Sequence, residues 1–235
     1  MLFRSEVEEP LLEPRASAEE IEFILKTCEA YLDKDPRPAD ILSVFAGLRP
    51  LAVPEEKSGP TKDVTRKHQI IISPSGLITV TGGKWTIYRK MAEDAIDKAV
   101  QVGCLPEKEC VTKTLPVHGY LRNMDFDAPL SYYGSDRVVL EETVMAEEPA
   151  LGERIHPAFP YIRAEVVWAV RHEMARTVED FLARRVRALF LDARSSIAAA
   201  PAVAEIMAAE LGRDAAWARG QVEEYTELAK GYIVG

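Results

Sequence analysis

The feature that most constrains the fold of this chain is a change in its hydrophobic pattern at about Gly103. Before that point, apolar residues recur both at helical spacing and in short β-rich runs. After it comes a connector with several prolines and glycines, and from about Arg137 onward almost every segment has helical periodicity. The pattern predicts two domains: residues 1–103 with mixed α and β structure, and residues 104–235, an all-α domain.

Local signals place the expected elements. Ser17 and Glu20 form a capping box that starts a helix, and the apolar run 41–46, ended by Gly47, predicts a short buried strand. The β-rich runs 68–72 and 77–81 predict a hairpin. An amphipathic helix should follow Gly82-Gly83, and the C-terminal domain should contain helices over residues 138–146, 162–174, 178–191, 197–211 and 214–232.

Composition and charge argue against several classes of protein. Asp and Glu number 38 against 29 Lys and Arg, a formal charge of −9, which disfavours nucleic-acid binding. No apolar run approaches the roughly 18 residues of a membrane span, and the acidic N-terminus is unlike a signal peptide. The three cysteines form no CxxC pair. His172-Glu173 lacks the second histidine of HExxH, so no metal site is predicted. We expect a cytoplasmic protein.

Positive charge gathers in one part of this acidic chain. Residues 49–90 hold eight basic and three acidic side chains, a net charge of +5. Such an island favours a small anionic ligand. Its loop lysines are typical of a solvated surface. Arg49 differs from them, because it follows an apolar run and precedes Pro50, where the chain is expected to reverse.

The sharpest local motif joins a strand to a helix through Gly82-Gly83, and continues as Lys84-Trp85-Thr86. Glycines let a backbone approach a flat or phosphorylated ligand. The unpaired amides and the dipole of a helix start favour an anion, and Lys84 adds a full charge there. A plain tight turn explains the two glycines equally well, because the motif is neither a P-loop nor GxGxxG.

Several stretches resemble the FAD-dependent glycerol-3-phosphate dehydrogenases, and the similarity runs from about Leu11 to the C-terminal helices. The stretches are residues 40–51, 65–68, 75–94 (which contains TGGKWTIYRKMAED), 159–166 and 173–185. The resemblance implies oxidation of sn-glycerol 3-phosphate to dihydroxyacetone phosphate by hydride transfer to FAD. It also implies a role in glycerol metabolism. It leaves the electron acceptor open between a quinone, which it favours, and oxygen, and it allows peripheral attachment to the cytoplasmic membrane.

The resemblance also implies roles for individual residues. Arg49 and Arg66 match the family's substrate-contacting arginines. Lys84 matches the lysine at the flavin and the substrate, and is the candidate catalytic residue. The flavin-contacting set is Gly82, Gly83, Lys84, Trp85 and Thr86.

The chain departs from the family pattern on its N-terminal side. It contains no strand–GxGxxG–helix unit, which in such enzymes holds the ADP half of FAD. We therefore expect an α+β N-terminal part, residues 1–103, with an incomplete sheet of an FAD-dependent oxidoreductase fold, followed by the all-α domain. The missing N-terminal FAD-binding half would be its partner, and the chain alone would be inactive. The alternative is a non-catalytic helical module with an anion-binding edge that acts in protein interaction.

Overall fold

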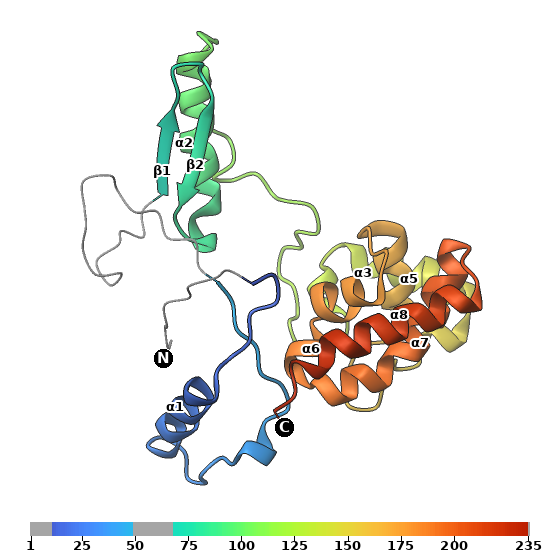
Figure 1. The fold of residues 1–235 in the computed structure, drawn as a ribbon. Coiled ribbons are helices and arrows are strands. Elements are labelled where there is room, and N and C mark those ends of the chain that lie inside the picture. Colours follow the sequence, from blue (N-terminus) through green and yellow to red (C-terminus); the bar gives the residue numbers. More distant parts are fainter. Residues whose placement is uncertain (1–10, 49–67, 235) are drawn as a thin grey trace. The chain divides into compact units, whose positions relative to one another are not determined.

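The structure, a computed structural model, describes residues 11–48 and 68–234. These residues are mostly helical and contain one two-stranded antiparallel sheet (Figure 1). Contacts divide the chain into two compact units, one of residues 1–47 with 119–235 and one of residues 48–118. We call them the helical unit and the hairpin unit. They do not test the expected division into domains 1–103 and 104–235, which stays a prediction.

The described part of the hairpin unit, residues 68–118, contains two strands and one α-helix. Strand β1, His68–Ile72, pairs antiparallel with β2, Ile78–Gly82, in the register His68 opposite Gly82. A 3-10 turn, η3 (Trp85–Ile87), leads into α2, Tyr88–Val102, which packs against β2 (Figure 1). The predicted hairpin is confirmed, with its second strand displaced by one residue.

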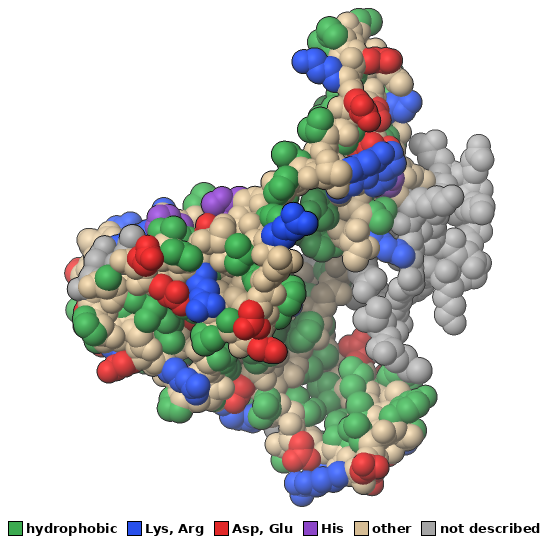
Figure 2. Space-filling view, turned by 180° about the vertical axis from the view of Figure 1, so that it is seen from behind, with side chains coloured by type: hydrophobic (Ala, Val, Ile, Leu, Met, Phe, Trp, Pro, Cys, Tyr) green, Lys and Arg blue, Asp and Glu red, His purple; other side chains and the backbone are tan. Residues whose placement is uncertain are grey.

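No described side chain of the hairpin unit is buried. Large apolar residues stay open to solvent, among them Ile71 at 53%, Leu77 at 66% and Ile96 at 63% exposure. Figure 2 shows apolar side chains on the surface of this unit among charged ones. A two-stranded hairpin is at best marginally stable by itself, and its unpaired edges can accept further strands. The described residues of this unit therefore form no core of their own.

The helical unit begins with α1, Ala18–Glu29, which starts at the predicted capping box. The Glu20 amide donates to Ser17 Oγ at 3.2 Å, and the Ser17 amide donates to a Glu20 carboxylate oxygen at 2.8 Å. The short turn η1, Pro38–Asp40, follows. No residue of α1 is buried, so its amphipathic sequence has no core to face within the described residues.

The C-terminal part of the helical unit agrees with the predicted all-α character. Its described elements are η4 Ser131–Tyr133, α3 Asp136–Val139, the π-helix η5 Leu140–Val144, α4 Met145–Glu147, η6 Pro149–Gly152, α5 Arg163–His172, the π-helix η7 Asp180–Arg185, α6 Ala188–Leu191, α7 Ala193–Leu211 and α8 Ala215–Lys230. The helix expected over 178–191 is broken, because Arg187 adopts a left-handed backbone with φ 60°. The helix expected over 138–146 is divided among α3, η5 and α4.

The main core lies between α5, α7 and α8. Phe181, Met207 and Tyr225 are almost fully buried there, and small residues of α7 such as Ala200 and Ala204 allow α8 to approach closely. Inside this core, Ser196 Oγ and Tyr225 Oη share a 2.5 Å hydrogen bond. The described residues of the chain therefore have their hydrophobic core in the helical unit.

The predicted buried strand over residues 41–46 is wrong. This segment is extended but pairs with helix ends instead of a strand, since the Val44 amide donates to the Tyr232 carbonyl at 2.9 Å and the Ala193 amide to the Leu42 carbonyl at 3.1 Å. Leu42 is 55% exposed. An apolar run gives no information about which backbone groups will pair with it, so helix ends could take the place of a strand.

Candidate functional site

The Gly82-Gly83 turn ends β2 with two residues of positive φ, 73° and 80°. A Cβ on Gly83 would lie 2.7 Å from Met91 Sδ and 3.1 Å from His68 Cβ. A side chain at this position would therefore be strained by its backbone and would collide with α2 and β1. This packing explains why the position requires glycine. The close approach of a ligand to the backbone of the turn stays a prediction.

Lys84, Trp85 and Thr86 follow the turn and are exposed. Lys84 has an extended backbone, with φ −142° and ψ 148°, and its carbonyl accepts from the Ile87 amide at 3.0 Å. Trp85 is 85% exposed and its ring stacks on Tyr88, with centroids 5.4 Å apart. The helix expected directly after the glycines thus begins as a 3-10 turn, and the motif presents a cation and a flat aromatic surface to solvent.

The neighbouring charges on α2 are neutralised within the unit. Lys90 Nζ lies 2.8 Å from Asp94, and Arg89 lies 3.0 Å from Glu93. His68 Nε2 also contacts Asp94, at 2.9 Å. The hydrogen bond from Lys90 lowers the pKa of Asp94, against a burial effect that raises it.

Lys84 differs from these neighbours. Among the residues that the structure describes, no carboxylate forms an ion pair with its ammonium. Of the described cations in the basic island, Lys84 is therefore the one whose charge is available to an anionic ligand.

Arg49 and Arg66 lie outside the described residues. Whether they converge with Lys84 on one ligand stays a prediction.

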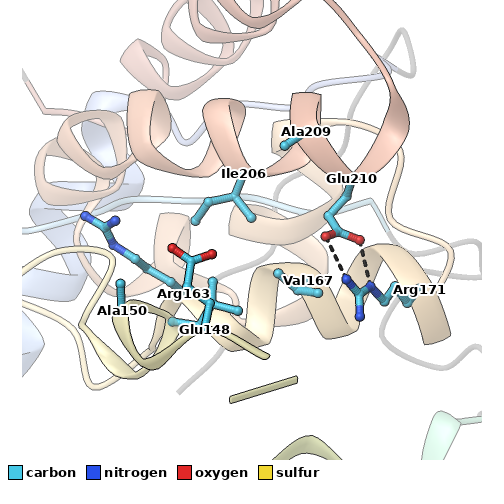
Figure 3. Close-up of a pocket in the computed structure, with 9 residues that line it drawn as sticks. Glu148, Ala150, Arg163, Val167, Arg171, Ile206, Ala209 and Glu210 are labelled. Atoms are coloured by element: carbon cyan, nitrogen blue, oxygen red, sulfur yellow. Dashed lines mark hydrogen bonds and ion pairs between the residues drawn. The ribbon is translucent and has the colours of Figure 1, made fainter. Parts of the chain in front are cut away.

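The helical unit contains a shallow pocket of about 250 Å³ that sequence reasoning did not indicate (Figure 3). Apolar side chains from η6, α5 and α7 face one another across it, including Leu151, Val167 and Ile206. Arg171 is held by Glu210 through two contacts, at 2.7 and 3.0 Å, drawn as dashed lines in Figure 3. With two arginines and two glutamates in its lining, the pocket has balanced charge and no nucleophile or acid–base pair.

Two further features concern metal ions and membranes. Within residues 11–48 and 68–234, no group of three or more His, Cys, Asp or Glu is arranged to hold a metal ion. None of the helices described there is long and apolar enough to cross a membrane. Cys28, Cys104 and Cys110 are free thiols.

The region that contains the glycine turn and much of the helical unit matches a known protein family. Residues 78–218, more than half of the chain, match the family described as the C-terminal domain of alpha-glycerophosphate oxidase. The chain is a member of this family. The match includes the Gly82–Thr86 motif and most of the helical unit, and confirms the resemblance on which the expected function rests.

Curated relatives are named glycerol-3-phosphate dehydrogenases. The probable enzyme of Caenorhabditis elegans is 40% identical over 91% of this chain and 32% of its own length. That of Arabidopsis thaliana is 37% identical over 94% of this chain and 39% of its own length. The human protein is 34% identical, and the match covers 32% of it. The chain therefore spans about a third of the length of these relatives.

A solved structure shares the fold. The glycerol-3-phosphate dehydrogenase from Bacillus halodurans, determined in complex with FAD, matches 97% of this chain and 48% of its own, with a TM-score of 0.75 and 24% sequence identity. About half of that longer protein therefore shares the fold of this chain.

The prediction of a cytoplasmic location is contradicted. The curated relatives from Caenorhabditis elegans, Arabidopsis thaliana and Mesocricetus auratus are all named as mitochondrial proteins. The prediction rested on cysteine usage and on the lack of a signal-peptide pattern or an apolar span, and none of these distinguishes the cytosol from another compartment that keeps thiols reduced.

Proposed function

We propose that this chain is the C-terminal portion of an FAD-dependent glycerol-3-phosphate dehydrogenase and supplies part of its substrate and flavin site. The observation that carries the proposal is the exposed Lys84, which has no ion-pair partner among the described residues and follows the Gly82-Gly83 turn inside the family match. Because the chain spans only about a third of its curated relatives, the complete activity is a proposal.

The exposed surface after β2 has the chemistry that a flavin would need. FAD, when bound, supplies the ring that accepts the hydride released from C2 of sn-glycerol 3-phosphate, which leaves dihydroxyacetone phosphate. Gly82, Gly83, Trp85 and Thr86 are the residues proposed to contact it. Lys84 would place a positive charge where negative charge gathers during the reaction, at no cost for reorganising water.

The substrate phosphate requires further cations. Arg49 and Arg66 are proposed to bind it, because the planar guanidinium fork matches two phosphate oxygens. Lys84 is proposed to contact the substrate as well. Each of these assignments comes from the motif positions in the sequence.

The proposed partner is the N-terminal FAD-binding half of such an enzyme. The open edges and exposed apolar side chains of the hairpin unit support it, since further strands and helices would cover them. The apolar residues of α1, including Ile24 at 49% exposure, are uncovered too, and Figure 2 shows apolar side chains gathered there. We propose that residues 1–103 complete an FAD-dependent oxidoreductase sheet only with that half.

Three finer assignments rest on the resemblance alone. We propose a quinone as the electron acceptor, peripheral association with a membrane, and a role in glycerol metabolism. The described residues contain no helix that could span a membrane, which leaves surface association as the form to test by sedimentation with vesicles.

Two measurements test the proposal. The purified chain, supplied with FAD, glycerol 3-phosphate and a dye acceptor, should show no turnover, and activity near that of a full-length relative would refute the fragment interpretation. A chimera in which this chain replaces the corresponding part of a full-length relative should be active. An inactive but folded, FAD-containing chimera would count against the proposed site.

A further inference from the structure

One carboxyl group in the helical unit is completely removed from water. Glu165, in the first turn of α5, has 0% exposure and is one of two buried polar or charged residues described, with Ser196. Burying a carboxylate is costly unless hydrogen bonds or a cation compensate for the lost hydration. The contacts of Glu165 therefore indicate what holds it there.

Three donors reach this carboxyl, and they come from two elements. The Ile162 amide, at the start of α5, donates to Oε2 at 2.7 Å, which completes a capping interaction. Tyr132 Oη donates to Oε1 at 2.5 Å and Tyr133 Oη donates to the same oxygen at 3.2 Å. One oxygen thus caps α5, and the other binds the turn η4.

The tyrosines belong to a segment that is also anchored by apolar packing. In residues 119–135, Leu130 is buried, the Tyr133 ring packs edge-on against Trp168 of α5 with centroids 6.1 Å apart, and the Ser135 amide donates to the Gly119 carbonyl at 3.1 Å. Other large side chains of the segment are open to solvent, such as Phe126 at 78% and Tyr120 at 57% exposure. The Glu165 hydrogen bonds therefore add to the packing of Leu130 and Tyr133 in fixing this segment to α5.

Among the residues that the structure describes, no cation forms an ion pair with Glu165. Besides Tyr132 and Tyr133, the groups that face it are Tyr161 before α5 and the carboxyl of Glu173 after it. Arg185, Asp136 of α3 and His172 act on Glu173, and Arg187 acts on Tyr161. Burial raises the pKa of Glu165, and this effect exceeds the lowering by the tyrosine and amide donors.

We propose that Glu165 is a pH-responsive latch, which holds residues 119–135 on α5 more firmly when its carboxyl is protonated than when it is ionised. With the latch open, the carboxyl is in water and has an ordinary affinity for protons. Because the closed state binds the proton more tightly, acid favours closing. Opening should increase as pH rises through the raised pKa, by at most about tenfold per pH unit for one group.

Hydrogen exchange of the full chain between pH 5 and 8, corrected for the intrinsic pH dependence of exchange, tests the latch. Protection of residues 119–135 should fall with rising pH, while α7 and α8 keep theirs. In Glu165→Gln the amide keeps one acceptor and adds a donor, as a protonated carboxyl does. The protection of residues 119–135 in this variant should therefore be independent of pH. Replacing both Tyr132 and Tyr133 by Phe should reduce protection of the segment about tenfold or more at every pH.

Glu153→Gln is the matched control, because Glu153 is 65% exposed in its side chain and contacts Arg163 at 3.6 Å. It should keep the pH profile of the parent chain. The same profile in Glu165→Gln, or a flat profile in the parent chain, would overturn the proposal. If Glu165→Gln does not fold, the carbon-13 signal of the Glu165 carboxyl decides, since a titration midpoint at or below that of an ordinary glutamate would also overturn it.

Discussion

At the scale of single residues, the candidate site depends on one exposed lysine and on the glycines that precede it. Lys84 is exposed, whereas Arg89 and Lys90 a few residues later are paired with acids of the same helix. A positive charge that has no ion-pair partner among the described residues, at a strand-to-helix turn, is suited to an anion that arrives from outside the chain. The residue-scale predictions therefore concern this charge and this turn.

Lys84→Ala, in the active chimera, should lower kcat more than it raises KM, because the positive charge is most valuable as negative charge develops. We expect a loss of roughly 10²-fold in kcat.

Arg49→Ala should mainly raise KM, with a cost of about 2–4 kcal/mol in kcat/KM, and Arg49→Lys should restore kcat/KM only partly because the planar fork is lost. Steady-state kinetics with Lys98→Ala as control, an exposed lysine of α2, checks both. Values of kcat/KM near those of the parent for both variants would refute the site assignment.

Gly83→Ala should destabilise the hairpin unit by about 1–3 kcal/mol, because alanine is strained at φ 80° and its Cβ would collide with Met91. Exchange of the β1 and β2 amides should increase. Gly220→Ala is the control, since Gly220 lies within α8 with no neighbouring atom within 4 Å of a built Cβ. There alanine should be neutral or stabilising. Unchanged protection in Gly83→Ala would show that the turn adapts.

At the scale of elements, local side chains set where a helix begins, and α7 is an example. Asp192 begins α7, where one carboxylate oxygen accepts from the Ser195 amide at 3.0 Å and the other from Ser195 Oγ at 2.7 Å. Burial acts to raise the pKa of Asp192, but hydrogen bonds from Ser195 and from the Arg194 amide, together with the Arg194 charge, outweigh it and hold the pKa below its ordinary value. The stability of α7 should therefore depend on the charge of this cap.

Asp192→Ala should cost about 1 kcal/mol at neutral pH. Because the pKa is lowered on folding, the stabilisation by the charged cap is present above the ordinary aspartate value and is lost as pH falls through the lowered one. Asp192→Asn keeps a capping oxygen but cannot titrate, so the stability difference between parent and Asn variant should shrink in acid. Urea unfolding from pH 6 to pH 2 measures it, with Asp97→Asn, an exposed acid of α2, as control. A difference independent of pH would contradict the role of the charge.

At the scale of the whole molecule, the buried core and the candidate site lie in different units. The described buried side chains are all in the helical unit, and the Gly82–Thr86 motif is in the hairpin unit. Within the helical unit, residues 11–47 are bound to the C-terminal part, since Arg15 donates to the Leu228 carbonyl at 3.3 Å and the Val44 amide donates to the Tyr232 carbonyl at 2.9 Å. Stability should therefore be unequal along the chain.

Limited proteolysis should cut first within residues 54–75 or 104–120 and leave a resistant C-terminal fragment. The fragment that contains residues 11–47 should stay bound to it on a sizing column, because their hydrogen bonds and the Phe45–Phe190 ring contact survive the cut. Val44→Pro removes the donated amide and should weaken this association, whereas Val44→Ala keeps it. Preferential survival of a fragment from the hairpin unit would contradict the expected order.

Local chemistry made the hairpin, its helix and the Ser17-capped helix predictable, whereas α7 begins at Ala193, four residues before the expected start at Ile197. The alternation in residues 68–81, the glycine break and the Ser17 cap act over a few residues, so the sequence alone determined them. The glycerol-3-phosphate dehydrogenase resemblance also came from sequence motifs. The sequence signalled neither the surroundings of Glu165 nor the left-handed Arg187 that divides the last predicted helix before α7.

What the tertiary structure alone decided is which distant groups meet. Residues 41–46 are apolar enough for a strand, yet their backbone groups pair with helix ends about 150 and 190 positions away, at Ala193 and Tyr232. Glu165 is a surface-type residue by composition, and only the approach of Tyr132 and Tyr133 makes its burial possible. Periodicity and capping are local properties of the chain, whereas burial and long-range hydrogen bonds depend on all elements packing together.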